Sequence, residues 1–451
     1  MRLCVLLAAA PGLLAQIAQI PETYRSLVEL SRSAPAEFGS DALLRLVESG
    51  KIADAGARRE LIEEAFRLAV SAKAAIRKSA ISGSTYDTSA GPLQQAYNLK
   101  LDTLSLQSRA VSDMMRIDPA AARKLLQEIP PPAFEALSCD DPFYYEVGDF
   151  YQALGAVVNS AFNAEERAKE ENVNFLLGYI GQIANPAQLY PAARTIQSAG
   201  VNNAQREILW AKFNAMLPNL AVDDRSMSAL AGQAPEGMDF ILAAVKQRST
   251  GCKNDVHPQV PGNVVAANAS QPDQQQKTAD ATPKLDRWWQ SPEAKRMLDD
   301  GRKLRYADNG QVLSPGDRST EEWQQKLSDY LSALGAWSAS SEKSEADYYN
   351  EKCSVYIALV ELIPQSSQRD KMLQAFFDFI TSSPLQQERP VEWYNQAAFM
   401  LDRVRSNISG DADPAKVQAE FERSGSPILA LEAALDQALG AKPFSWVTSS
   451  Q

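Results

Sequence analysis

The sequence predicts an all-α protein. Apolar residues recur at intervals of three and four between positions 61 and 69, while Arg59, Glu63 and Arg67 occupy another face of the same expected helix. Signals that start a helix, in which a capping side chain precedes a proline, are repeated along the chain. Long stretches of alternating apolar and polar residues, which are typical of strands, are absent. Together these patterns favour helices throughout.

The helix boundaries follow from the same local signals. Expected starts are Asp118-Pro119, Asn185-Pro186, Ser291-Pro292 and Asp413-Pro414, and expected stops are Ser49-Gly50, Ile129-Pro130 and Ile363-Pro364. Asp140-Asp141-Pro142 is expected to cap a helix over 143–158. In the C-terminal part, the pattern predicts helices over 321–337, 345–362, 369–381 and 391–404.

Length and composition predict two domains. A chain of 451 residues is too long for one compact core. Residues 251–284 hold four prolines, a run of glutamines and several asparagines, which predicts a polar, disordered linker. The expected domains are therefore 16–250 and 285–451, and six of the seven tryptophans follow the linker.

Short turns between helices of this length favour antiparallel hairpins. In this respect the chain resembles solenoid-like helical-repeat arrays of the TPR or HEAT kind, although it has no strict period and does not reproduce the TPR spacing of Trp, Gly, Tyr and Pro. The resemblance implies an architecture of stacked hairpins in each domain. It implies no particular activity.

The N-terminus predicts an export signal over 1–15. Arg2 is followed by an apolar run over 3–10, a Pro-Gly break and a cleavage site after Ala15. The alternative is a buried N-terminal helix, because Ile17 and Ile20 continue the apolar content. Export implies a periplasmic or extracellular protein. No later segment approaches the roughly 20 apolar residues of a transmembrane helix.

The cysteines allow one disulfide. Cys139 and Cys252 both lie in loop-like contexts and could pair in an oxidising compartment, although sequence separation alone does not show that their sulfurs meet. Cys353 lies in an apolar helical run, which favours a buried, unreactive thiol.

The single histidine argues against much familiar chemistry. His257 lies in the expected linker, so a Ser-His-Asp triad, a Cys-His pair or a His-rich zinc site has no imidazole held in place. Nucleotide-binding and zinc motifs are also missing, and we expect no cofactor and no metal. A net charge of −11 argues against nucleic acid or an anionic membrane as partner.

Carboxylates are the only plentiful catalytic groups, but no catalytic residue can be assigned. The adjacent acidic pairs are Asp140-Asp141, Asp223-Asp224, Asp299-Asp300, Glu63-Glu64, Glu165-Glu166 and Glu170-Glu171. Neighbouring residues on a helix point about 100° apart, so the helical pairs do not form a shared acid–base site. Capping explains Asp140-Asp141 better than metal binding does.

Aromatic pairs are the candidate binding residues. Trp288-Trp289 and Trp393-Tyr394 lie near expected helix starts, where one ring of each pair faces away from its neighbour. An exposed ring could stack on a sugar or anchor a peptide. The alternative is that these rings belong to the core that a helical domain needs.

The sequence leaves several functions open. The first hypothesis is an exported helical scaffold that binds a protein, peptide or cell-envelope partner without catalysis. The second is an all-α, carboxylate-dependent hydrolase or lyase acting on an extracellular polymer. A third is a structural subunit whose apolar surfaces are completed by oligomerisation; the oligomeric state does not follow from the sequence.

Overall fold

The protein is all-α, as predicted. The computed structural model describes residues 20–73, 76, 78–79, 99–132, 134–137, 143–231, 237–248, 292–338, 348–353, 355–356, 366–395, 397 and 424–440. The extended structure in these ranges includes one antiparallel pair of two-residue strands, β1 (Lys78–Ser79) and β2 (Phe143–Tyr144), and an isolated bridge between Tyr306 and Val312. The predicted signal (1–15) and linker (251–284) lie outside the described residues.

The first set of helices runs from residue 22 to residue 246. It comprises α1 (Glu22–Ser33), α2 (Ala36–Glu48), α3 (Ala55–Ala69), α5 (Thr103–Met115), α6 (Pro119–Glu128), α7 (Gly148–Ser160), α8 (Ala164–Ala168), α9 (Glu171–Ile180), α10 (Leu189–Ser198), α11 (Asn203–Met216), α12 (Asp224–Ala231) and α13 (Asp239–Lys246), with 3-10 turns η1 (Pro186–Gln188) and η2 (Leu217–Asn219). The second set comprises α14 (Pro292–Arg302), the 3-10 turn η4 (Asp317–Ser319), α15 (Glu321–Ala336), α17 (Ser366–Ser382), α18 (Leu385–Glu388) and α21 (Pro427–Leu439).

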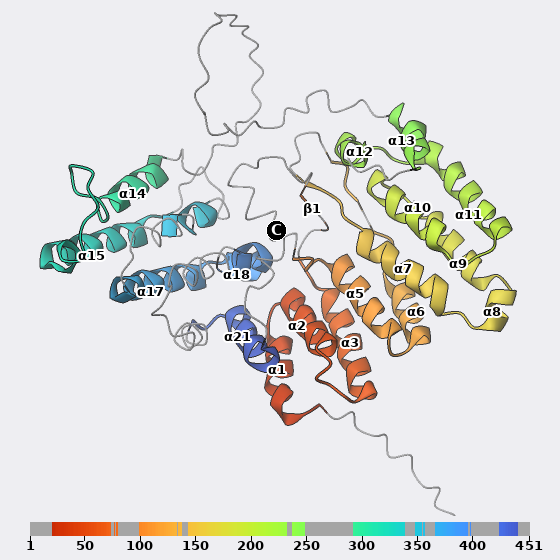
Figure 1. The fold of residues 1–451 in the computed structure, drawn as a ribbon, viewed down its shortest axis with the longest axis horizontal. Coiled ribbons are helices and arrows are strands. Elements are labelled where there is room, and N and C mark those ends of the chain that lie inside the picture. The colour runs from red at the N-terminus through yellow and green to blue at the C-terminus, as the bar shows by residue number, and fades with distance from the viewer. Residues whose placement is uncertain are drawn as a thin grey trace, which may run out of the picture.

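The helices of the first set follow an arc (Figure 1). Helices α2, α5, α7 and α10 pack against one another in turn along its inner side, and α3, α6, α9 and α11 lie behind them. Each inner helix therefore buries one face against an outer helix.

The predicted helix signals are confirmed at several positions. The Asp118 carboxylate accepts a hydrogen bond from the backbone N–H of Ala121 at 2.9 Å, where α6 begins with Pro119. Asn185 and Gln188 form a capping box around η1. Gly50, with φ +70°, follows the end of α2 in the left-handed conformation that glycine adopts without strain.

The helices predicted in the C-terminal part are also found where the structure describes them. Helix α15 ends one residue before the predicted 337, and α17 begins three residues before the predicted 369. Residues 348–353, 355–356, 391–395 and 397 are helical and fall inside the other two predicted helices.

The helix predicted over 143–158 is wrong at its start. Phe143 and Tyr144 pair with β1, and α7 begins only at Gly148. The Tyr145 hydroxyl donates to the carbonyl oxygen of Glu135 at 2.9 Å and accepts from the Glu135 N–H at 3.0 Å. These contacts with distant residues fix an extended backbone where local pattern favoured a helix. Asp140 and Asp141 lie outside the described residues.

Helices α1 and α2 approach closely at Gly39. A Cβ atom on this glycine would lie 2.1 Å from the carbonyl oxygen of Ser31 in α1. On the other face of α2, the Ser40 hydroxyl donates to the Ala65 carbonyl of α3 at 2.9 Å. The position of α2 between its neighbours thus depends on a glycine and a serine side by side.

The last described helices pack against the first ones. Helix α21 contacts α1 and α2, and the Phe38 ring on α2 meets the Tyr394 ring edge-on, with 5.0 Å between centroids. The Lys51 ammonium donates to the Ala438 carbonyl at 2.7 Å, at the C-terminal end of α21. Buried side chains of both helix sets form one continuous hydrophobic cluster.

None of the helices in the described ranges is both long and apolar enough to span a bilayer.

Candidate functional site

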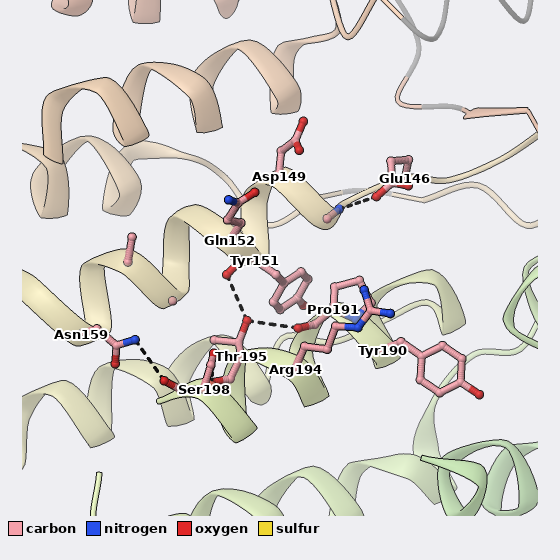
Figure 2. Close-up of a pocket in the computed structure, with 13 residues that line it drawn as sticks. Glu146, Asp149, Tyr151, Gln152, Asn159, Tyr190, Pro191, Arg194, Thr195 and Ser198 are labelled. Atoms are coloured by element: carbon pink, nitrogen blue, oxygen red, sulfur yellow. Dashed lines mark hydrogen bonds between the residues drawn. The ribbon is translucent and has the colours of Figure 1, made fainter. Parts of the chain in front are cut away.

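A groove of about 500 Å³ lies between α7 and α10 (Figure 2). Such a volume is in the range of small-ligand pockets. One of its ends is formed by the turn before α7, and its walls are the facing sides of the two helices.

The floor of the groove is formed where α7 and α10 touch. The Thr195 hydroxyl of α10 donates to the Tyr151 carbonyl of α7 at 3.0 Å. At Gly155, an added Cβ would lie 3.6 Å from the Thr195 Cγ2 atom, an ordinary van der Waals contact. The helices would therefore tolerate a methyl group here, but any side chain at 155 would fill the floor of the groove.

The groove faces the inside of the arc. On α7, Phe150 points outward, because its ring meets that of Tyr179 on α9 with 5.8 Å between centroids. Each helical residue turns the side chain by about 100°, so Gln152, Ala156 and Asn159 project from the opposite side of α7. These three residues line the groove.

The carboxylates at one end of the groove are already engaged. Glu146 accepts a hydrogen bond from the backbone N–H of Gly148 at 2.7 Å. Asp149 forms an ion pair with Lys100, with 2.8 Å between nitrogen and oxygen. Both therefore fix the start of α7 and the chain before it.

The amide at the other end is also engaged. Asn159 donates to the Ser198 carbonyl at 3.2 Å and accepts from the Gly200 N–H at 2.7 Å. It ties the C-terminal end of α10 to α7.

Arg194 and Gln152 are the polar side chains of the groove that remain available. Both are exposed and line the groove, and in the described ranges neither has a hydrogen bond or ion pair. Figure 2 shows Arg194 on α10 and Gln152 on α7, on the two walls. A guanidinium group and a carboxamide thus face a space that a ligand could enter.

Two tyrosines lie beneath this surface. The Tyr151 hydroxyl accepts from the Gln188 side chain at 3.2 Å, and burial raises its pKa well above the usual value. The Tyr190 hydroxyl is buried without a partner in the described part of the chain, and burial, followed by the nearby Asp239, raises its pKa. Neither hydroxyl is a candidate proton donor or acceptor at neutral pH.

The aromatic candidates that the structure describes lie in the core. Trp393 and Tyr394 are both 0 % exposed, and the Trp393 indole N–H donates to the Ile380 carbonyl at 2.7 Å. Neither ring has an open face for a ligand, which agrees with the alternative that they are core residues. Trp288 and Trp289 lie outside the described residues.

The cysteine candidates are described only in part. Cys139 and Cys252 lie outside the described residues, so their pairing stays a prediction. Cys353 is a free, fully buried cysteine, as predicted, and burial raises the pKa of its thiol.

The acidic pairs serve the helices. Contacts of their described members are Glu63 with Arg59, Glu64 with Arg32, Glu165 with Lys169, Glu166 with Arg123, Asp299 with Arg302 and Asp300 with Lys303. Asp223 accepts from the Ser226 N–H at 2.7 Å and from Asn185, and so caps α12. Within the described residues, no group of three or more His, Cys, Asp or Glu side chains is arranged to hold a metal ion.

Two buried carboxyl groups have a strongly raised pKa, and both lie away from the groove. Burial raises the pKa of Glu432 on α21 and of Asp113 on α5 to about 7. Both side chains are enclosed between packed helices, with 2 % and 4 % exposure.

Sequence reasoning missed the groove. Its one signal is Gly155, an isolated glycine within the apolar helical run of α7, which is typical of a close helix–helix approach. The positions of Arg194 and Gln152 opposite each other follow only from the packing of α7 on α10. No protein-family model, curated protein or solved structure matches this chain.

Proposed function

We propose that this protein is a non-enzymatic helical scaffold that binds an extended segment of a partner protein in the groove between α7 and α10. The observation that carries the proposal is the pair of open polar groups, Arg194 and Gln152, above a floor without a side chain at Gly155. The stacked inner helices support a solenoid-like surface, on which such segments are commonly bound.

The size of the groove indicates the length of the bound segment. The lining residues of α7 run from Gly148 to Asn159. Eleven helical steps of about 1.5 Å span roughly 16 Å, and an extended chain advances about 3.3 Å per residue. Four or five residues of a partner therefore fill the groove.

The open groups indicate the chemistry of the segment. A guanidinium group binds a carboxylate through two parallel hydrogen bonds, so Arg194 favours an acidic side chain or a C-terminal carboxylate. The Gln152 carboxamide can both donate to and accept from the backbone of an extended peptide. The missing side chain at Gly155 lets that backbone approach the floor.

The positions of the carboxyl groups support a binding function rather than catalysis by carboxylates. A polymer-cleaving site needs two carboxyl groups at an open groove, one of them with a raised pKa. Glu432 and Asp113 have raised pKa values but are buried between helices. In the groove, Glu146 and Asp149 are held by a backbone N–H and by Lys100.

The test is a binding screen of four- to six-residue peptides, with and without acidic residues, against the full chain. We expect Arg194→Glu to lower the affinity for the best-binding acidic peptide at least ~10-fold, because one charge-assisted hydrogen bond contributes ~1.5–3 kcal/mol. Arg296→Glu makes the same charge change at an exposed residue of α14, outside the groove, and should leave binding unchanged. If both variants lost affinity equally, the effect would be due to the overall charge of the protein, and the assignment of Arg194 to the binding site would be refuted.

A second variant tests the floor. Gly155→Ala adds a methyl group that the contact of α7 with α10 can accommodate, and it should weaken binding while far-UV circular dichroism and the urea midpoint stay unchanged. Binding that is not weakened by this change would move the site elsewhere.

We also propose that the partner is met after export, because the first 15 residues have the pattern of a signal peptide. N-terminal sequencing of the protein purified from its native source should begin at Gln16. A chain that retains residues 1–15 would refute export by this signal.

A further inference from the structure

A row of charged side chains, buried at its two ends, joins α21 to α2 and α5. Glu432 on α21 is 2 % exposed and lies 3.6 Å from the Arg45 guanidinium on α2. Arg45 also lies 3.7 Å from Asp41, one turn earlier on the same helix. The row therefore begins at the contact of the last described helix with the second.

The row continues into α5. Arg109 contacts Asp41 at 2.6 Å and donates to both carboxylate oxygens of Glu48 at 2.6 Å. Asp113, one turn after Arg109, accepts from Arg116 at 2.9 Å. Burial is the largest influence on Asp113 and raises its pKa, and the negative charge of the nearby Glu48 raises this pKa further.

The row holds more carboxyl groups than cations. Its four carboxyl groups are those of Glu432, Asp41, Glu48 and Asp113, and its two enclosed guanidinium groups are those of Arg45 and Arg109. The Arg116 side chain is 72 % exposed and adds little charge inside. Glu48 is exposed, so three carboxyl groups and two guanidinium groups are enclosed. With every carboxyl group ionised, the enclosed part of the row would carry a net charge of about −1, which burial disfavours.

The excess negative charge is best assigned to the two ends of the row, Glu432 and Asp113. One carboxyl oxygen of Glu432 and one of Asp113 are buried and accept no short hydrogen bond in the described part of the chain; the nearest polar groups are Tyr394 for Glu432 and Glu48 for Asp113. Protonation of the carboxyl group at one of these ends brings the enclosed charge to zero. Geometry and charge balance thus point to the same two groups.

The other groups around Glu432 are few. Tyr394 faces it and stabilises the charged form, while Asp41 and Asp436 disfavour that form. The buried residues of α1, which also packs on α21, are Leu27, Val28 and Ser31, none of which titrates near neutral pH. Burial is the largest influence and raises the pKa of Glu432, whereas Arg45, the second, lowers it. The balance leaves the pKa of Glu432 at about 7.

We infer that the contact of α21 with α1 and α2, here called the seam, is a pH-responsive joint that is tight when Glu432 is protonated and loosens when Glu432 ionises. The released carboxylate would be hydrated, whereas the docked one shares Arg45 with Asp41. A carboxyl group that binds its proton more tightly in the docked state stabilises docking at low pH, and this stabilisation is lost as the pH rises through about 7. The joint is separate from the groove and does not depend on the proposed function.

The expected size follows from the two pKa values of Glu432, 4.5 for an ordinary glutamate and about 7 when docked. Proton linkage then raises the equilibrium constant for opening the seam roughly 30-fold between pH 5.5 and pH 8.0.

Hydrogen exchange of the full chain, followed by mass spectrometry and corrected for the intrinsic rates at each pH, measures this opening. Peptides from α1 and α21 should lose protection roughly 30-fold over that interval, while peptides from α9 and α10 change little. Glu432→Gln mimics the protonated group and should keep the seam protected at both pH values. Glu207→Gln, at an exposed position of α11, is the matched control and should behave like the unmodified chain.

Three outcomes would overturn the inference. If the protection of α1 and α21 from exchange does not depend on pH, the seam is not a pH-responsive joint. An unchanged pH dependence in Glu432→Gln assigns the proton to another group. Loss of the pH dependence in Asp113→Asn but not in Glu432→Gln would place the responsive group on α5, away from the seam.

Discussion

Replacing Trp393 with alanine should destabilise the protein strongly without touching the groove. The side chain is completely buried, and its indole N–H donates to the Ile380 carbonyl at 2.7 Å. The Trp393 carbonyl in turn accepts from the buried Tyr349 hydroxyl at 2.9 Å. Trp393 therefore links the helical segment 390–395 to α17 and to the segment that contains Tyr349.

The magnitude has two parts. Truncating a fully buried tryptophan to alanine costs about 3–5 kcal/mol of the free energy of unfolding, through lost burial and the cavity that remains. The Ile380 carbonyl also accepts from the Ser383 N–H at 3.3 Å, so it keeps one partner when the indole is removed. Trp393→Phe, which keeps a large ring but no donor, should therefore cost only about 1–2 kcal/mol.

Urea unfolding followed by far-UV circular dichroism measures both variants, with peptide binding to the groove measured in parallel. We expect Trp393→Ala to unfold at clearly lower urea than Trp393→Phe, and both folded variants to bind the same peptides. An alanine variant that unfolds at the same urea concentration as the unmodified chain would refute the burial of this ring, and with it the packing of 390–395 on α17.

Three further changes test the packing. Gly39→Ala should lower the free energy of unfolding by at least about 1–3 kcal/mol, because the new methyl group would meet the Ser31 carbonyl. Gly178→Ala, at an exposed position of α9 with nothing within 4 Å, should raise it by about 0.5–1 kcal/mol. Urea midpoints of the two variants that move in the same direction would contradict this. Asp118→Ala should cost about 1 kcal/mol by removing the cap of α6, and Asp118→Asn should retain most of that stability; equal losses in the same unfolding assay would show that the ion pair with Arg59 matters more than the cap. Arg109→Met should cost about 1–3 kcal/mol because it leaves the partly buried Asp41 carboxylate without this cation. Arg109→Lys, which keeps the charge but not the two parallel hydrogen bonds, should cost less. A thermal melt in which the methionine variant is as stable as the unmodified chain would show that the row is not held by charge.

Local chemistry made the helices predictable. A capping side chain before proline marks a helix start whatever the rest of the chain does, and so Asp118 was placed correctly. Tyr145 was placed wrongly because its partner, the backbone of Glu135, decides its conformation and is not part of the local pattern. Short-range signals cannot report such a contact.

The site was less predictable than the fold. The aromatic pair Trp393-Tyr394 has the composition of either a binding site or a core, and only its burial distinguishes the two. Arg194 and Gln152 are ordinary surface residues in sequence and acquire meaning only from the groove between α7 and α10. The Glu432–Arg45 contact joins residues at nearly opposite ends of the chain, beyond the reach of any local pattern.

The position of α21 has a consequence for synthesis. Lys51 and the Ala438 carbonyl that it contacts are separated by 387 residues. At about 5–20 residues per second, a ribosome needs roughly 20–80 s to make the chain between them. During that time α1 can pack on α2, but α21, which also packs on α1, has not yet been made. The part of α1 that α21 covers therefore stays exposed for most of synthesis, and a chaperone that binds this surface should raise the yield of folded protein.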